Sequence, residues 1–149
     1  MRDHPTKRRA LLFLNPRSRS GGGRATDGAV LHLEASGFIL TRASCAHAAD
    51  LTREVKRLAH EVDLVIVGGG DGTVNAMLRG VLETRLPLAI LPFGTANDLA
   101  RTLGIPSDPI AAAKVIVAGH MRRIDVGQVN DQFFVNVASM GLSVELARR

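Results

Sequence analysis

Asp71 and Thr73 have the residue types and spacing to do chemistry, because they lie in a glycine-rich run, Gly68–Thr73, that reads Gly-Gly-Gly-Asp-Gly-Thr. The run follows four apolar residues at 64–67. It leads into a helical pattern in which apolar residues recur three and four apart from Val74 onward. Glycine lets the backbone approach an anion closely, and the first N–H groups of a helix point toward it. The segment therefore predicts a phosphate-binding turn between a strand and a helix.

The acid in the centre of this turn indicates a metal ion. A carboxylate beside phosphate groups is repelled unless a cation lies between them, so Asp71 suggests Mg²⁺. Two other phosphate-binding loops are excluded. A Walker A loop needs Gly-Lys, which this chain lacks, and the dinucleotide fingerprint needs glycine where Thr73 stands. A tight strand-to-helix turn without any ligand remains the alternative.

A second segment, 91–101, repeats the same chemistry and reads Leu-Pro-Phe-Gly-Thr-Ala-Asn-Asp-Leu-Ala-Arg. It also follows an apolar run, and it places Gly94 and Thr95 before a short helix that contains Asp98. Ordinary capping is the alternative, with Thr95 or Asn97 as the helix cap and Asp98 favouring the helix dipole. Two successive strand ends with the same residues favour one shared site.

The elements that must position these residues alternate along the chain. Strands are expected near 9–14, 38–42, 64–67 and 88–91, with helices between them, and a further helix opens at Ser107-Asp108-Pro109. This alternation predicts an α/β fold, a three-layer arrangement of a parallel sheet with helices on both faces. Ligands in such sheets bind beyond the carboxyl ends of the strands, where both motifs lie.

The last part of the chain changes character. Residues 121–129 and 133–138 read as consecutive strands joined by a turn at Asn130-Asp131, and 141–146 could begin another. We therefore expect an α/β domain at 1–125, followed at 126–149 by the start of a β-rich second domain that is truncated here.

Composition bounds the function. A chain of 149 residues can bury one core, and the apolar runs are all shorter than a membrane span. The single Cys45 excludes an internal disulfide, which favours a reducing cytoplasm. The chain has no Trp or Tyr, which argues against a base-stacking nucleic-acid surface. The net charge of +5 indicates either a solvated basic surface without a specific role or a surface that attracts ATP and anionic lipid head groups.

The two motifs together resemble the catalytic domain of the diacylglycerol kinase family. They read Gly-Gly-Asp-Gly-Thr-x-Asn at 69–75 and Pro-x-Gly-Thr-x-Asn-Asp-x-Ala-Arg at 92–101. This family includes sphingosine, ceramide and bacterial lipid kinases. The first motif alone is shared with NAD kinases and 6-phosphofructokinases, and the second favours lipid kinases. The resemblance runs from Asn15 to about Gly141.

This resemblance implies a kinase that transfers the ATP γ-phosphoryl group to a lipid hydroxyl such as that of diacylglycerol, with ATP and Mg²⁺ as cofactors. Asp71, Asp98 and Asp125 match three acids of a magnesium–water network, and Asp71 is also the catalytic residue expected here. In the family, a basic residue follows Asn-Pro-x-Ser-Gly. Here four residues, 17–20, lie between Asn15-Pro16 and the glycines at 21–23, so the alignment of residues 15–24 with the family motif stays open. The expected nucleotide contacts are Asn15, Arg24, Ser44, Gly69, Gly70, Asp71, Gly72, Thr73, Asn75, Gly94 and Thr95.

The resemblance also places the general base and much of the lipid pocket in a C-terminal half that this sequence does not contain, so this chain alone is expected to be inactive. The expected partners are ATP and a lipid at the membrane surface, with no nucleic acid. We expect a cytoplasmic protein, with peripheral membrane contact as one option and edge-to-edge dimers of exposed strands as another. Two alternatives stay open, namely an NAD kinase-like enzyme with a soluble acceptor and a non-catalytic nucleotide-binding domain.

Overall fold

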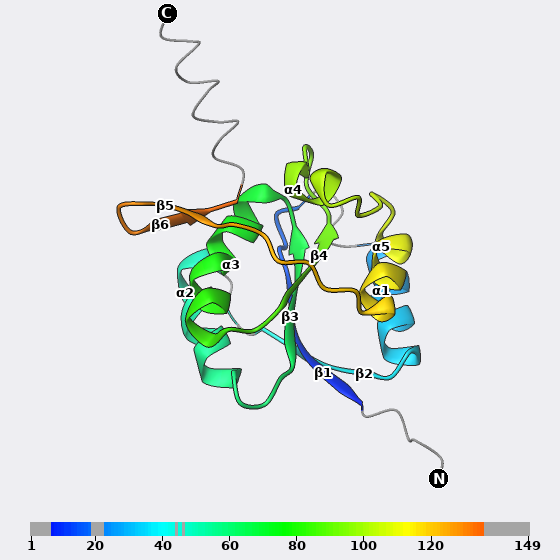
Figure 1. Cartoon of the computed structure of the whole chain (residues 1–149). Helices are drawn as coiled ribbons and strands as arrows, with labels where there is room; N and C mark the ends of the chain where they lie inside the picture. Colours follow the sequence, from blue (N-terminus) through cyan, green and yellow to red (C-terminus); the bar gives the residue numbers. More distant parts are fainter. Residues whose placement is uncertain (1–6, 19–22, 44, 46, 136–149) are drawn as a thin grey trace, which may run out of the picture.

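Four parallel strands form the central sheet, in the order β2-β1-β3-β4, and a two-stranded antiparallel hairpin, β5-β6, forms a separate sheet (Figure 1). The computed structural model describes residues 7–18, 23–43, 45 and 47–135. The elements in chain order are β1 (Arg8–Leu14), α1 (Arg24–Ala35), β2 (Phe38–Arg42), α2 (Ala48–Leu58), β3 (Leu64–Gly69), α3 (Asp71–Thr84), β4 (Leu88–Pro92), α4 (Asp98–Thr102), α5 (Pro109–Ala118), β5 (Gly127–Val129) and β6 (Gln132–Phe134).

The predicted fold class, a three-layer α/β arrangement, is confirmed. α2 and α3 lie on one face of the sheet, and α1 and α5 cover the other (Figure 1). From β1 the chain crosses to β2 on one side and later to β3 on the other, so the strand order reverses between β1 and β3. In parallel sheets this switch point is where the loops at the carboxyl ends separate and leave a crevice for ligands.

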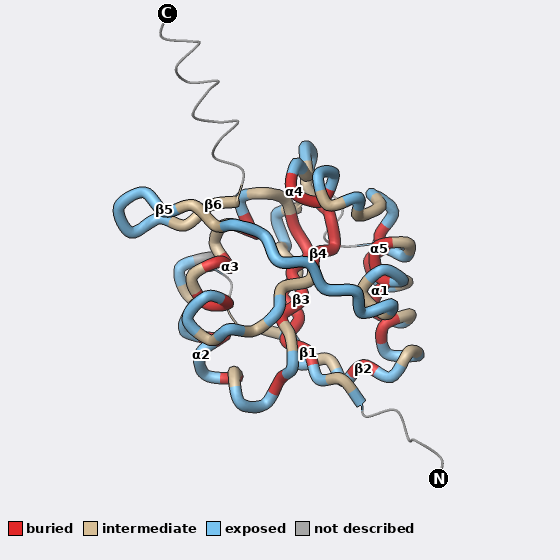
Figure 2. Tube along the Cα trace, in the orientation of Figure 1, coloured by how far each residue is buried: buried red, intermediate tan, exposed pale blue. Residues whose placement is uncertain are grey.

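Each strand divides its apolar residues between two cores, because successive side chains point to opposite faces. Leu11 and Phe13 pack toward α2 and α3, whereas Ala10 and Leu12 pack toward α1 and α5. Figure 2 shows the buried residues concentrated along the central strands and on the helix sides that face them. With both faces covered, the sheet holds the strand ends rigidly beneath the loops.

The helix start predicted at Ser107-Asp108-Pro109 is confirmed. The Asp108 carboxylate accepts a hydrogen bond from the Ala111 N–H at 2.8 Å, and Pro109 occupies the first turn of α5. α5 ends at Gly119, whose φ of 75° lies in the left-handed region that favours glycine. On the opposite face α2 ends at Leu58, and Val62 is a buried core residue in the loop that follows.

The structure corrects the prediction of a strand over 121–129. Only Gly127–Val129 is a strand, and 120–126 is an exposed segment without regular structure. A strand forms only where another strand pairs with it, and pairing begins at Gly127, opposite Phe134. The predicted turn at Asn130-Asp131 is confirmed, with Asn130 at a φ of 53°. The predicted strand over 133–138 is β6 up to Phe134, while 136–138 and the possible strand over 141–146 lie outside the described residues.

Among the described residues, none of the helices combines the length and the apolar character that crossing a bilayer requires.

Candidate functional site

Asn15 and Thr73 join the two strand ends at the switch point. Asn15 directly follows β1, and its backbone N–H donates to the Gly68 carbonyl oxygen at 2.8 Å. Its side-chain Nδ2 donates to Thr73 Oγ1 at 2.8 Å, and its Oδ1 accepts the Arg17 N–H at 2.9 Å. Because a hydroxyl that accepts one hydrogen bond can still donate another, Thr73 keeps a donor suited to a phosphate oxygen.

Gly70 and Gly94 let the two predicted loops touch. A Cβ on Gly94 would lie 2.4 Å from the Cα of Gly70, and a Cβ on Gly70 would lie 3.1 Å from the Cα of Gly94. Gly69 is similarly confined, since its Cβ would meet Thr73 Oγ1 at 2.7 Å. These glycines are therefore required by packing within the protein.

Gly72 differs from these glycines. It lies in the first turn of α3, and a Cβ added there would meet nothing within 4 Å. Glycine inside a helix is about 1 kcal/mol less favourable than alanine, and no neighbour in the described part of the chain explains this residue. A ligand lying against the backbone would explain it. The predicted phosphate turn thus has one side closed by protein and one side open.

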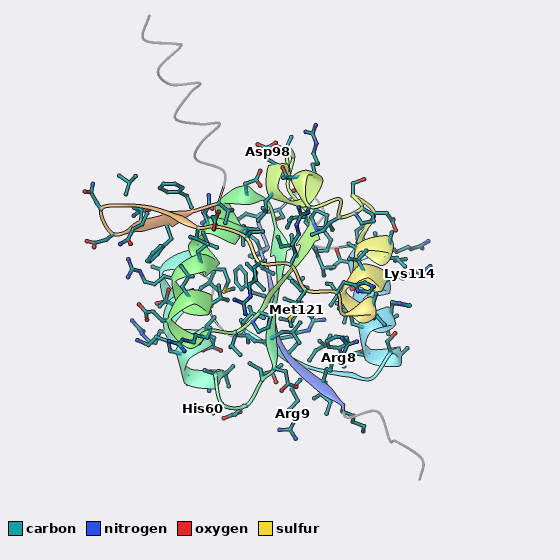
Figure 3. All side chains as sticks on the ribbon, in the orientation of Figure 1. Arg8, Arg9, His60, Asp98, Lys114 and Met121 are labelled. Atoms are coloured by element: carbon teal, nitrogen blue, oxygen red, sulfur yellow. The ribbon has the colours of Figure 1, made fainter. Side chains whose placement is uncertain are left out.

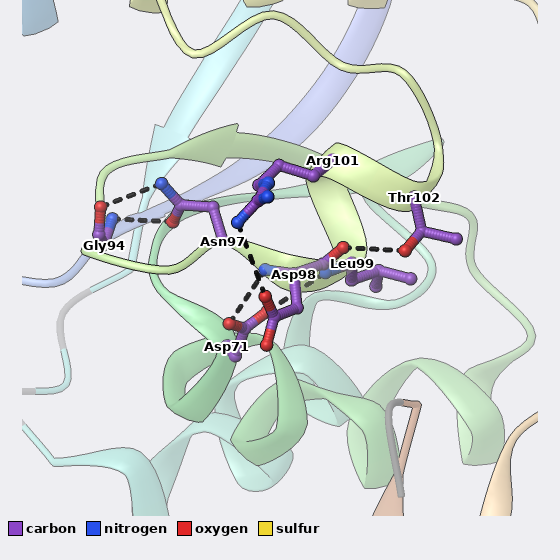
Figure 4. Close-up of polar contacts among 7 residues, drawn as sticks. All are labelled: Asp71, Gly94, Asn97, Asp98, Leu99, Arg101 and Thr102. Carbon is purple, nitrogen blue, oxygen red and sulfur yellow. Dashed lines mark hydrogen bonds and ion pairs between the residues drawn. The ribbon is translucent and has the colours of Figure 1, made fainter. Parts of the chain in front are cut away.

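Asp71 caps α4 (Figure 4). Its Oδ2 accepts the Asp98 N–H at 3.0 Å and its Oδ1 accepts the Leu99 N–H at 3.2 Å. Asn97 occupies the N-cap position, as one predicted alternative expected, but its side chain does not cap α4. It bonds back to Gly94, with its Oδ1 accepting the N–H at 2.9 Å and its Nδ2 donating to the carbonyl oxygen at 2.8 Å. Sequence reasoning missed the true cap, which lies 27 residues before α4.

Asp98 lies at the carboxyl edge of the sheet, at the opposite end from Arg8, Arg9 and His60 (Figure 3). Its exposed carboxylate is 3.9 Å from Arg101 Nη1. Asp125 is also exposed and lines a cavity of about 320 Å³ together with Leu99 and Thr102 of α4. Asp98 is the first residue of the helix that Asp71 caps, and Asp125 lies beside that helix.

The three predicted magnesium ligands do not form a ready cluster. Within the described ranges, no group of three or more His, Cys, Asp or Glu residues is placed to hold a metal ion. The structure brings Asp71 against the backbone of Asp98, whereas Asp125 lines a cavity next to α4. Ligation of Mg²⁺ by these acids stays a prediction.

The other predicted nucleotide contacts are spread around this edge. Thr95 is exposed in the loop after β4, and Arg24 is the exposed first residue of α1. Asn75 is partly buried on α3, and its Oδ1 accepts the Val135 N–H at 3.4 Å, so it faces the hairpin. Ser44 lies outside the described residues.

Cys45 lies just after β2, at the same edge of the sheet, and its thiol pKa is raised. Burial raises the pKa of the partly buried Cys45 thiol, and the negative charge of Glu54 raises it further. The thiol is therefore predominantly protonated at neutral pH and is a poor nucleophile.

The assembled edge can bind an anion. The N-terminus of α3 carries the positive end of its dipole, worth about 0.3–1 kcal/mol toward a negative charge. The backbone at Gly72 is open, and the Thr73 hydroxyl lies beside it. Phosphate groups match both the charge and the hydrogen-bonding character of this surface.

Known proteins share this arrangement. Residues 9–129 match the family described as "Diacylglycerol kinase catalytic domain". The chain is 36% identical over 139 residues to a diacylglycerol kinase of Staphylococcus aureus, covering 91% of this chain and 44% of that protein. It is 37% identical over 139 residues to a diacylglycerol kinase of Staphylococcus saprophyticus, covering 91% of this chain and 46% of that protein.

A solved structure agrees with these relatives. The crystal structure of a diacylglycerol kinase from Bacillus anthracis superposes with a TM-score of 0.72 at 36% identity, covering 87% of this chain and 46% of that one. This chain thus spans a little under half the length of the relatives that it matches. The match of the family over residues 9–129, together with the shared fold, shows that the chain belongs to the diacylglycerol kinase catalytic-domain family.

Proposed function

We propose that this chain forms the ATP-binding part of a lipid kinase that transfers the γ-phosphoryl group of ATP to a lipid hydroxyl such as that of diacylglycerol. Relatives that carry the name diacylglycerol kinase support the reaction class. The observation that carries the nucleotide assignment is the turn at Gly69–Thr73, which is closed against Gly94 on one side and open at Gly72 on the other.

In this proposal the phosphates lie over the N-terminus of α3. The backbone N–H groups at the start of α3 and the Thr73 hydroxyl donate to phosphate oxygens, while Asn15 holds Thr73 in place. Gly94 and Thr95 form the adjoining wall, because the loop after β4 packs on Gly70. Arg24, at the start of α1, would supply a positive charge next to the loop that follows β1.

The acids at this edge fit Mg²⁺ by their chemistry, since carboxylate oxygens are the hard ligands that this ion prefers. Asp71, Asp98 and Asp125 would hold it, and the ion would offset charge on the β- and γ-phosphates during transfer. Asp71 has a second task, because its two oxygens also orient the backbone of α4 that presents Asp98.

The acceptor side of the reaction belongs to the whole protein. The relatives are about twice as long as this chain, and we propose that the general base and most of the lipid contacts lie outside it. The full protein would then meet its lipid at the membrane surface, whereas the chain alone would bind nucleotide and turn over poorly.

Calorimetric titration of the chain with ATP, with and without Mg²⁺ and with NAD as the comparison ligand, tests this proposal. We expect magnesium-dependent binding of ATP and no response to NAD. Binding of NAD in place of ATP would favour the NAD kinase-like alternative, and binding of neither would contradict the nucleotide assignment.

A further inference from the structure

α3 connects the phosphate loop to the β5-β6 hairpin. Its first turn carries the phosphate loop residues Asp71–Thr73. One and two turns further, Asn75 and Arg79 stand at i and i+4, on one face of the helix. That face meets the β5-β6 hairpin.

Asn75 and Arg79 hold the two ends of β6. Arg79 Nη2 donates a hydrogen bond to the carbonyl oxygen of Asp131, before the strand, and its guanidinium lies 5.0 Å above the ring of Phe133. Asn75 Oδ1 accepts the N–H of Val135, directly after the strand, at 3.4 Å. Both contacts join side chains of α3 to the hairpin across more than fifty residues of sequence.

The hairpin depends on such anchors. Each of its strands has three residues, and an isolated two-stranded hairpin of this size is marginal in water. In Figure 1 it extends away from the central sheet beside the start of α3. Its placement is therefore set by α3 and not by its own pairing.

Arg79 is itself held in position from α2. Its Nη1 lies 3.6 Å from Glu83 Oε1, and the other carboxylate oxygen, Oε2, lies 3.1 Å from Lys56 Nζ. The hydrogen bond from Lys56 lowers the pKa of Glu83, so the carboxylate remains charged and keeps its hold on Arg79. The ion pairs with Glu83 and Lys56 thus help to orient the Arg79 guanidinium that contacts the hairpin.

The hairpin in turn forms a wall of the candidate site. An open cavity of about 760 Å³ lies between α2, α3 and β6, with Phe133 on the hairpin side and Gly72 and Asn75 on the side of the phosphate loop. A shift of the hairpin would change the space beside Gly72, where we place the phosphates.

We infer that Asn75 and Arg79 are positioning residues that hold the hairpin against the phosphate loop, so that nucleotide binding and hairpin placement are coupled through α3. This inference rests on the proposed function, and it replaces the nucleotide contact expected for Asn75 from the sequence with a contact to the hairpin.

Hydrogen exchange of the full 149-residue chain, read on peptides that cover 127–135 with and without Mg-ATP, tests the inference. We expect Asn75→Ala and Arg79→Ala to speed exchange of the hairpin amides about tenfold while the ATP dissociation constant changes less than about threefold. Mg-ATP should slow hairpin exchange in the unaltered chain and lose that effect in Arg79→Ala. Arg79→Lys keeps the charge but not the planar contact with Phe133. Its rate of hairpin exchange should therefore fall between those of the unaltered chain and Arg79→Ala.

Arg53→Ala is the matched control, because Arg53 lines the same cavity and its ion pair is with Asp50, on its own helix. It should leave hairpin exchange unchanged. A tenfold loss of ATP affinity in Asn75→Ala with unchanged hairpin exchange would overturn the inference and make Asn75 a nucleotide ligand. Absence of ATP binding in the unaltered chain would contradict the proposed function, while the nucleotide-free exchange rates would still decide whether Asn75 and Arg79 anchor the hairpin.

Discussion

The carboxylate of Asp71 accepts a hydrogen bond from the backbone N–H of Asp98 at 3.0 Å, so the acid of the first motif holds the backbone of the second motif in place. The second bond, from Leu99 at 3.2 Å, completes a cap on α4. One carboxylate therefore sets the orientation of a helix and also lies where we expect the metal ion.

Replacing Asp71 by Asn should lower both stability and magnesium-dependent ATP affinity. Asn keeps one acceptor oxygen but turns an NH₂ group toward a backbone N–H, and losing a helix cap costs about 0.5–2 kcal/mol. Urea denaturation measures the free energy of unfolding, and calorimetry measures ATP binding.

Asp98→Asn is the comparison for Asp71, because Asp98 contributes its backbone N–H to the cap while its side chain is exposed. We expect stability within about 0.5 kcal/mol of the unaltered chain and weaker magnesium-dependent binding. Equal losses of stability in both variants would contradict the capping role assigned to Asp71.

Gly72→Ala should raise stability and weaken ATP binding. The added methyl group meets no protein atom within 4 Å, and replacing glycine in a helix stabilises by about 0.4–1 kcal/mol. The same methyl group would occupy the space that we assign to the phosphates. Thermal unfolding with and without Mg-ATP separates the two effects, and unchanged ATP affinity would rule out close approach of the phosphates at Gly72.

Gly94→Ala should be destabilising by about 1–3 kcal/mol, the usual range for overpacking. Its Cβ would lie 2.4 Å from a backbone atom, the Cα of Gly70, so the two loops must separate. Chemical denaturation measures this effect. A stability equal to that of Gly72→Ala would show that the two loops are not in contact in solution.

Arg8→Ala should destabilise the chain without changing ATP affinity. Arg8 Nη2 donates to the Val117 carbonyl oxygen at 2.8 Å and its guanidinium lies 4.3 Å from the ring centre of Phe38, at the opposite end of the sheet from the candidate site. We expect a loss of about 1–2 kcal/mol in denaturation. Arg9→Ala, which keeps the backbone bond to Asp63, should change stability by less than about 0.5 kcal/mol, and a similar loss in both variants would argue against the Arg8 contacts.

Cys45 should react slowly with alkylating reagents at neutral pH. Because burial and Glu54 raise the pKa of the thiol, the thiolate fraction at a given pH is lower than for an exposed cysteine, and the rate should rise only at higher pH. Glu54→Gln removes a negative charge and should lower the pKa of the thiol, so the pH–rate curve should shift to lower pH. Mass spectrometry follows the single site, since the chain has one cysteine.

The same labelling reports on the nucleotide. Cys45 directly follows Ser44, a predicted nucleotide contact, so Mg-ATP should protect the thiol. Equal labelling rates with and without saturating Mg-ATP would place the nucleotide away from this strand end and would argue against Ser44.

The sequence by itself determined the local elements and the candidate turn. The glycine run at 68–72, the continuous apolar strands and the cap at Asp108 are signals between neighbours, so they are readable without the fold, and with the second motif they identified the family. The strand predicted over 121–129 forms only at 127–129, because pairing needs a partner that local pattern does not reveal.

The tertiary structure decided which groups those residues bind. Asp71 reaches α4 because parallel pairing of β3 with β4, with Gly69 opposite Pro92, brings the two loops to one edge. Asn75 reaches the hairpin because the chain after α5 places β6 against α3. Such contacts join residues 27 and 60 positions apart. Their geometry follows from sheet register and helix packing, which depend on the whole core and leave no mark in the spacing of neighbouring residues.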